Sequence, residues 1–209
     1  MSTWTTFYIK TEGKNSVVDQ LKTLTGIAET KDGDYPADLY DNYLFDETAK
    51  PTYLAIGKTT PNWITVSHNS FNNLVEWGNV ISKNLDTKVI VTIAQSVSDA
   101  YYFSLFDKGQ KIREIEVCYS DDFKPKNFGQ RFEFENEQPG KKEEYDGEIE
   151  YYFGFEEIED YCKHFGLEIQ TDFDKVSWTI LMSGIKQKTI NDFVNTELSK
   201  TRKPWWKFW

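Results

Sequence analysis

The chain contains 209 residues and has a formal net charge of −10, with 39% hydrophobic and 28% charged residues. This length can bury a sizeable core, and the composition is typical of a globular protein and not of a disordered chain. Residues 1–199 hold all 34 acidic residues but only 20 of the 24 basic ones, a net charge of −14, which repels nucleic acid and attracts basic partners.

The first part of the chain predicts a strand, a helix and a loop. Residues 4–10 (WTTFYIK) are rich in the aromatic and β-branched residues that are typical of strands. Asn15 or Ser16 then caps a helix that ends at Gly26, because these residue types favour such positions. Residues 28–50 are polar and rich in turn-forming residues, which predicts a long loop with at most a short helix.

Two more strands and a second helix are expected next. Residues 51–58 and 63–68 are predicted strands, and Asn69 or Ser70 caps the helix that follows. Residues 88–94 form a nearly continuous β-branched run, which indicates a strand buried on both faces. The apolar residues of the helix recur at helical spacing and are Phe71, Leu74, Trp77, Val80, Ile81 and Leu85.

The remaining elements begin with a hairpin. Residues 101–106 and 112–119 flank Asp107-Lys108-Gly109-Gln110, a strong turn signal. Residues 120–150 contain scattered prolines and glycines and are expected to be irregular. The other expected elements are short strands at 132–134 and 149–153, helices at 155–165 and 189–198, and a strand at 176–182.

The order of these elements predicts an α+β fold, because strands and helices are mixed without strict alternation. We expect a largely antiparallel sheet with a β-α-β-β-β core and with helices packed on one face. A single domain should span residues 1–199, with an irregular acidic insertion at 120–150. Residues 200–209 form a basic, aromatic C-terminal tail.

An acidic segment, residues 133–160, holds twelve carboxylates. It is open to three interpretations: solvated strand faces, a surface for a basic partner, or a metal site, although no spacing resembles a calcium loop. If it binds a partner, the contacts are expected among its acids and nearby tyrosines. These candidate residues are Glu143, Glu144, Tyr145, Asp146, Glu148, Glu150, Tyr151 and Tyr152.

The tail (KPWWKFW, residues 203–209) combines aromatic and basic residues. Three roles are open: packing on the acidic body of the protein, docking into a partner or a second copy, or contact with a lipid interface, where Trp is favoured. Its candidate contact residues are Trp205, Trp206, Phe208 and Trp209.

Catalytic residues are sparse in this sequence, which contains no phosphate loop and no G-x-S-x-G, CxxC or HExxH motif. An enzymatic alternative depends on His68 and Asp99, because active sites favour strand ends. A structural role is the competing interpretation for His68 and for His164. No cofactor or metal is expected.

The two cysteines, Cys118 and Cys162, are too few for a disulfide framework and lack zinc-ligand spacing. Cys118 lies within a predicted strand and is expected to act as a small hydrophobic residue. The sequence has no signal peptide and no apolar stretch of 18 residues. We therefore expect a reducing, cytoplasmic location.

Residues 61–119 contain PNWITVSHNSFNNLVEW and then KVIVTIAQSVSDAYYFSLFDKGQKIREIEV. This succession of a Trp-led strand, a helix, a buried strand, a Ser-Asp turn and a glycine hairpin resembles uncharacterised bacterial cytosolic proteins. Small acidic α+β proteins of this kind resemble immunity proteins of bacterial toxin systems, which neutralise a toxin by binding it. The resemblance implies binding to a protein and provides no catalytic residue.

The leading hypothesis is a non-enzymatic cytosolic binding protein, of the immunity-protein kind, that acts through an acidic, aromatic-rich surface on a basic protein partner. One alternative is an enzyme with a site near His68 and Asp99. Another is a peripheral membrane or assembly factor that uses the Trp-rich tail.

Overall fold

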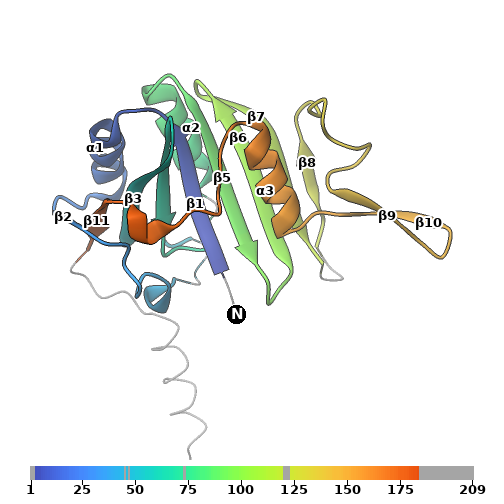
Figure 1. The fold of residues 1–209 in the computed structure, drawn as a ribbon, viewed down its shortest axis with the longest axis horizontal. Helices are drawn as coiled ribbons and strands as arrows, with labels where there is room; N and C mark the ends of the chain where they lie inside the picture. Colours follow the sequence, from blue (N-terminus) through green and yellow to red (C-terminus); the bar gives the residue numbers. More distant parts are fainter. Residues whose placement is uncertain (1–2, 45, 47, 73, 120–122, 184–209) are drawn as a thin grey trace, which may run out of the picture.

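The computed structural model describes residues 3–44, 46, 48–72, 74–119 and 123–183 (Figure 1). Within these residues, nine strands form one sheet in which every strand pairing is antiparallel, which confirms the expected large antiparallel sheet in a mixed fold. In sheet order the strands are β2 (Thr30–Gly33), β11 (Trp178–Met182), β3 (Tyr53–Thr60), β4 (Trp63–His68), β1 (Thr3–Lys10), β5 (Lys88–Gln95), β6 (Ala100–Asp107), β7 (Gln110–Cys118) and β8 (Lys126–Phe128).

The expected β-α-β-β-β core is not a contiguous unit of the sheet. Along the chain, β4 is followed by helix α2 (Val75–Asn84) and then by β5. In space, β1 lies between β4 and β5 and pairs with both, so that Phe7 is opposite Val66 on one side and Val91 on the other. The first strand of the chain therefore occupies the centre of the sheet.

Helices cover both faces of the sheet, which corrects the prediction of helices on one face. Helices α1 (Lys14–Thr25) and α2 pack on the face to which Phe7 points, and α3 (Phe155–His164) packs on the face to which Tyr8 points (Figure 1). Neighbouring residues of a strand point to opposite faces. A strand that is apolar on both faces, as predicted for 88–94, must be buried on both faces. The sheet therefore requires a packed helical layer on each side.

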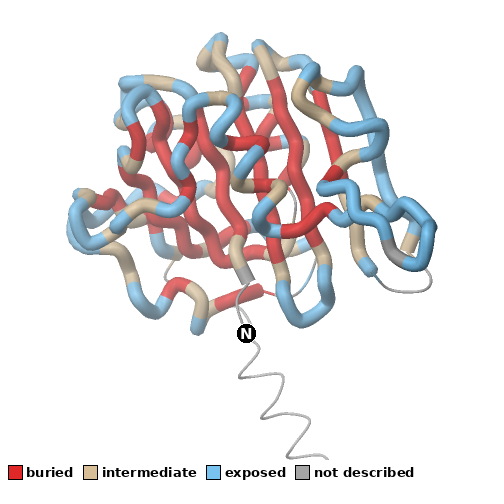
Figure 2. Tube along the Cα trace, turned by 45° about the vertical axis from the view of Figure 1, so that its right-hand side comes forward, coloured by how far each residue is buried: buried red, intermediate tan, exposed pale blue. Residues whose placement is uncertain are grey.

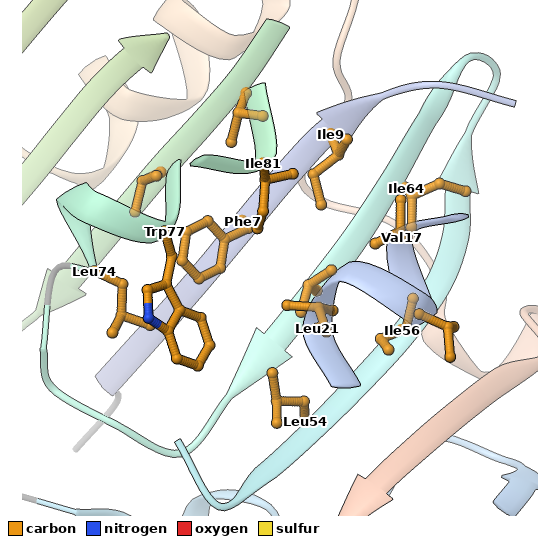
Figure 3. Close-up of a cluster of buried hydrophobic side chains, with 14 of the residues drawn as sticks. Phe7, Ile9, Val17, Leu21, Leu54, Ile56, Ile64, Leu74, Trp77 and Ile81 are labelled. Atoms are coloured by element: carbon orange, nitrogen blue, oxygen red, sulfur yellow. The ribbon is translucent and has the colours of Figure 1, made fainter. Parts of the chain in front are cut away.

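The core between the sheet and the first two helices is closely packed (Figure 3). Val17 and Leu21 of α1 and Trp77 and Ile81 of α2 are buried against Phe7 and its neighbours. Buried residues are concentrated in the central strands, and exposed residues in the loops and at the periphery (Figure 2). No helix among the described residues is long and apolar enough to cross a membrane.

Helix α2 approaches the sheet at Gly78, where an added Cβ would lie 2.7 Å from Cε2 of Phe106 and 3.0 Å from Cγ2 of Val91. We expect Gly78→Ala to lower the free energy of unfolding by about 1–3 kcal/mol, because overpacking outweighs the better helix propensity of alanine. Urea denaturation measures this change. Glu76→Ala, on the exposed side of α2, should change stability by less than about 0.5 kcal/mol. A Gly78→Ala protein as stable as the wild type would contradict the close approach.

The predicted loop at residues 28–50 contains a strand and a short helix. Strand β2 pairs with β11, and the Thr179 hydroxyl donates a hydrogen bond of 2.6 Å to the Asp32 carboxylate. All four β2 residues are exposed, so the strand has no apolar alternation that the sequence could have revealed. A 3-10 helix, Tyr40–Asn42, follows.

Helix α2 starts later than predicted. The expected cap residues Asn69 and Ser70 lie several residues upstream of Val75, where the helix begins. The Asn69 side chain instead accepts hydrogen bonds of 3.0 Å from the backbone N–H groups of Thr52 and Tyr53. The Asn69 side chain therefore links the start of β3 to the residues that follow β4.

Other predictions are confirmed. The strands at 4–10, 63–68 and 88–94 are present, and so is the β6–β7 hairpin with its turn residues Lys108 and Gly109 at φ values of 50° and 79°. The C-terminal strand is β11, and a short 3-10 helix, Phe173–Lys175, precedes it. The expected helix at 189–198 and the tail at 200–209 lie outside the described residues, as do Trp205, Trp206, Phe208 and Trp209.

Candidate protein-binding surface

The irregular segment after β7 is attached to the sheet by a buried ion pair. Arg113 donates two hydrogen bonds to Glu135, from Nε to Oε1 at 2.9 Å and from Nη2 to Oε2 at 2.6 Å. The two side chains are only 1% and 0% exposed. Arg113 Nη1 also donates to Asn127 Oδ1 and to the carbonyl of Phe128, both at 2.7 Å. Glu135 is therefore a buried, paired carboxylate and not part of a solvated strand face.

The expected strand at 132–134 is a turn whose aromatic residues pack on α3. The Phe134 ring stacks on His164, with 3.7 Å between ring centroids, and it meets the edge of Tyr161 at 5.1 Å. Phe132 and Phe165 form an edge-to-face contact, with 5.3 Å between ring centroids. These contacts support the structural interpretation of His164 and hold the segment beside the helix.

A two-stranded hairpin, β9 (Lys141–Tyr145) and β10 (Glu148–Tyr152), projects from this region of the body (Figure 1). Its turn residues Asp146 and Gly147 have φ values of 50° and 84°, as a tight hairpin turn requires. The sequence analysis expected only a short strand at 149–153. The Asp-Gly pair between alternating residues was the signal that would have revealed the whole hairpin.

The hairpin concentrates negative charge on exposed side chains. Its two lysines are outnumbered by the exposed acids Glu143, Glu144, Asp146, Glu148 and Glu150, all predicted as contact residues. Glu143 is directly opposite Glu150, an unfavourable pairing of like charges that the Lys141 ammonium, 2.9 Å from Glu143, partly offsets. Tyr145 belongs to β9, and its side chain lies outside the described part of the structure.

The two faces of the hairpin differ. One face presents Lys141, Glu143, Glu148, Glu150 and Tyr152, and we call it the acidic-aromatic face. On the opposite face, the Tyr151 hydroxyl donates to Glu137 at 2.6 Å, which lowers the pKa of that carboxyl group. Tyr151 is thus engaged with the body of the protein, whereas the acidic-aromatic face is open to a partner.

The acidic-aromatic face continues into the body through stacked tyrosines. The rings of Tyr152 and Tyr119 lie 5.0 Å apart at an angle of 16°. The Tyr119 hydroxyl accepts a hydrogen bond of 2.8 Å from the Phe153 N–H and donates one of 3.3 Å to the Phe153 carbonyl. The edge of Tyr101 meets Tyr152 at 6.4 Å. Tyr119 was not among the predicted contact residues, because its neighbour Tyr152 is 33 positions away in the sequence.

His68 and Asp99, the predicted catalytic candidates, occupy different environments. His68 is 1% exposed, its ring lies 5.3 Å from that of Phe7, and its Nδ1 accepts a hydrogen bond of 3.3 Å from the Ser70 N–H. Burial lowers the pKa of His68 to about 3. Asp99 lies in the exposed β5–β6 turn, where its carbonyl accepts a hydrogen bond of 3.2 Å from the Tyr119 N–H. The structure does not bring His68 and Asp99 together in an acid–base arrangement.

A cavity of about 440 Å³ opens at the ends of β5, β6 and β7, and Phe71, Tyr102 and Glu116 are among its lining residues. Neither His68 nor Asp99 lines it. Glu116 forms an ion pair with Lys126. In the described part of the chain, no group of three or more His, Cys, Asp or Glu side chains is arranged to hold a metal ion.

The two cysteines lie in different environments. Cys118 is partly exposed, and its thiol lies 3.4 Å from the Ser98 carbonyl oxygen. Cys162 is buried in α3, and burial raises the pKa of its thiol. A raised pKa keeps the thiol protonated and unreactive, so Cys162 contributes to packing.

Comparison of the chain with protein-family models, with curated proteins and with solved structures found no match.

Proposed function

We propose that the protein is a non-enzymatic binding protein that captures a basic protein partner through the acidic-aromatic face of its β9–β10 hairpin. A toxin neutralised by an immunity protein is the kind of partner we expect. The observation that supports the proposal is the row formed by Glu143, Glu148 and Glu150, exposed on one face of a projecting hairpin. Acidic surfaces accelerate encounter with basic partners, and tyrosines favour interface contacts.

The attachment of the hairpin also supports binding. The stacked Tyr119 and Tyr152, the hydrogen bonds at Phe153, and the Tyr151–Glu137 pair all fix its base before any partner arrives. A surface that is ordered in advance loses less conformational entropy on association. The carboxylates at the tip are therefore presented in a fixed arrangement on an extended arm.

The test uses a triple variant, Glu143→Gln, Glu148→Gln and Glu150→Gln, in the full-length chain. A basic protein captured from the native host by the wild type is identified, purified and measured by surface plasmon resonance. We expect the triple variant to reduce the association rate constant about 10-fold or more at low salt, because steering by charge is lost. The wild-type association rate should fall steeply as ionic strength rises.

A matched control separates the hairpin from net charge. Asp19→Asn, Glu29→Gln and Asp41→Asn remove the same three charges from exposed positions in or near α1 and the 28–50 segment. When both triple variants are compared at about 0.1 M salt, this control should leave association within about 2-fold of the wild type, since screening then confines the effect of charges to about 10 Å. Equal losses in both triple variants, or a captured partner that is acidic, would show that the hairpin is not the binding surface.

A further inference from the structure

The base of the hairpin, where Tyr119 and Tyr152 stack, has the features of a site for one type of side chain. We infer that Tyr119, Tyr152 and the adjacent carboxylates Asp99 and Glu157 recognise an arginine of the basic partner. This inference rests on the proposed function and specifies which cation the surface selects.

The rings of Tyr119 and Tyr152 are ordered and partly exposed. Tyr119 is 47% exposed and Tyr152 is 42% exposed, although both are large aromatic residues. Both hydrogen-bonding capacities of the Tyr119 hydroxyl are used by Phe153, so the ring orientation is fixed. The Tyr152 ring packs against Gly154, where an added Cβ would lie 2.6 Å from Tyr152 Cε1. Two ordered rings are thus held partly in solvent, where a planar group can stack on them.

Two carboxylates, Asp99 and Glu157, place negative charge around the rings. The Asp99 carbonyl accepts a hydrogen bond from the Tyr119 N–H, and the Asp99 carboxylate accepts one of 3.4 Å from the hydroxyl of Tyr101, whose ring meets Tyr152. Glu157 is fixed by a hydrogen bond of 2.7 Å from the Gly154 N–H to its Oε2. Burial, with smaller contributions from the Glu157 and Asp99 carboxylates, raises the pKa of Tyr119. The carboxylates of Asp99 and Glu157 place negative charge near the rings, and this charge favours a cation there.

Arginine and lysine differ in how their charged groups contact aromatic rings. A guanidinium group is planar, stacks on aromatic rings and donates a fork of hydrogen bonds that matches a carboxylate. An ammonium group is compact and strongly hydrated, and it gains little from a flat ring. The combination of exposed rings with carboxylates at their edges therefore favours arginine.

The experiment compares two probes of equal charge, a fluorescent hexa-arginine peptide and a fluorescent hexa-lysine peptide, by anisotropy titration of the full-length protein. We expect hexa-arginine to bind the wild type about 5-fold more tightly, because cation–π contact at exposed sites contributes this order of discrimination. The Gln triple variant should weaken both peptides equally and keep the preference, since it changes charge and not the rings.

Three variants test which residues cause the preference for hexa-arginine over hexa-lysine. Tyr119→Leu should abolish it, whereas Tyr119→Phe, which keeps the ring but loses the hydroxyl that fixes its orientation, should retain part of it. Asp99→Asn should reduce it without disturbing the turn, because asparagine tolerates the φ of 43° found there. Thermal unfolding of each variant confirms folding.

Equal binding of both peptides to the wild type, or binding of neither at millimolar concentration, would overturn the arginine site. Capture of the basic partner through the hairpin acids would still stand in that case, because it is measured separately.

Discussion

Alanine in place of either Arg113 or Glu135 should lower the free energy of unfolding by about 3–5 kcal/mol, because the remaining charge is left buried without its partner. The bidentate pair is almost completely shielded from water, and Arg113 also binds Asn127 and the Phe128 carbonyl. Chemical denaturation of the two single variants measures this loss. The effect should include release of the segment that leads to the hairpin.

Two further variants test the cause. The double variant Arg113→Met with Glu135→Leu should be more stable than either single alanine variant, since it removes both charges. Lys108→Ala breaks the exposed pair with Asp86, whose side chains are 63% and 76% exposed, and should cost less than about 1 kcal/mol. Single alanine variants with losses as small as that of Lys108→Ala would show that the Arg113–Glu135 pair does not hold the segment.

Acid should destabilise the protein through His68. Its pKa in the folded protein is about 3, below the ordinary value of 6.5, so the unfolded chain binds more protons between these two values. Stability that is present above pH 6.5 is therefore lost as the pH falls toward 3. The contribution of this one group should be about 2 kcal/mol between pH 6.5 and pH 4.5, because the slope approaches 1.36 kcal/mol for each pH unit only once the unfolded His is fully protonated.

Urea denaturation at several pH values measures this dependence. His68→Gln keeps an acceptor for the Ser70 N–H and cannot become protonated in this range, so its stability should fall less steeply with acid than that of the wild type. Identical slopes for the wild type and His68→Gln would mean that His68 is not buried in its neutral form.

The sequence predicted the elements whose side chains show a clear period. The β-branched run of β5 and the Gly109 turn of the β6–β7 hairpin are local signals, and both were located correctly. Strand β2 was missed, because an exposed edge strand has no apolar period. The position of β1 between β4 and β5 was also missed, because pairing between distant strands depends on the whole fold.

The candidate surface was predicted in part. Glu143, Glu148, Glu150 and Tyr152 were expected as contacts, and the structure places them on one face of one hairpin. The same acidic segment contains Glu135, whose burial no local pattern could reveal, because its partner Arg113 is 22 positions away. Composition indicated which segment is acidic. Tertiary contacts determine which of its carboxylates are exposed to solvent and which are buried.

The position of β1 also constrains how the chain can fold during synthesis. Strand β1 has neighbours that end at His68 and Gln95, so it cannot be paired on both sides until the chain as far as Gln95 has emerged from the ribosome. At one edge of the sheet, β2 joins through β11, which ends at Met182. Pairings between such distant segments form slowly and leave apolar strands unprotected in the interim. The nascent chain should therefore depend on chaperone protection until β11 is made.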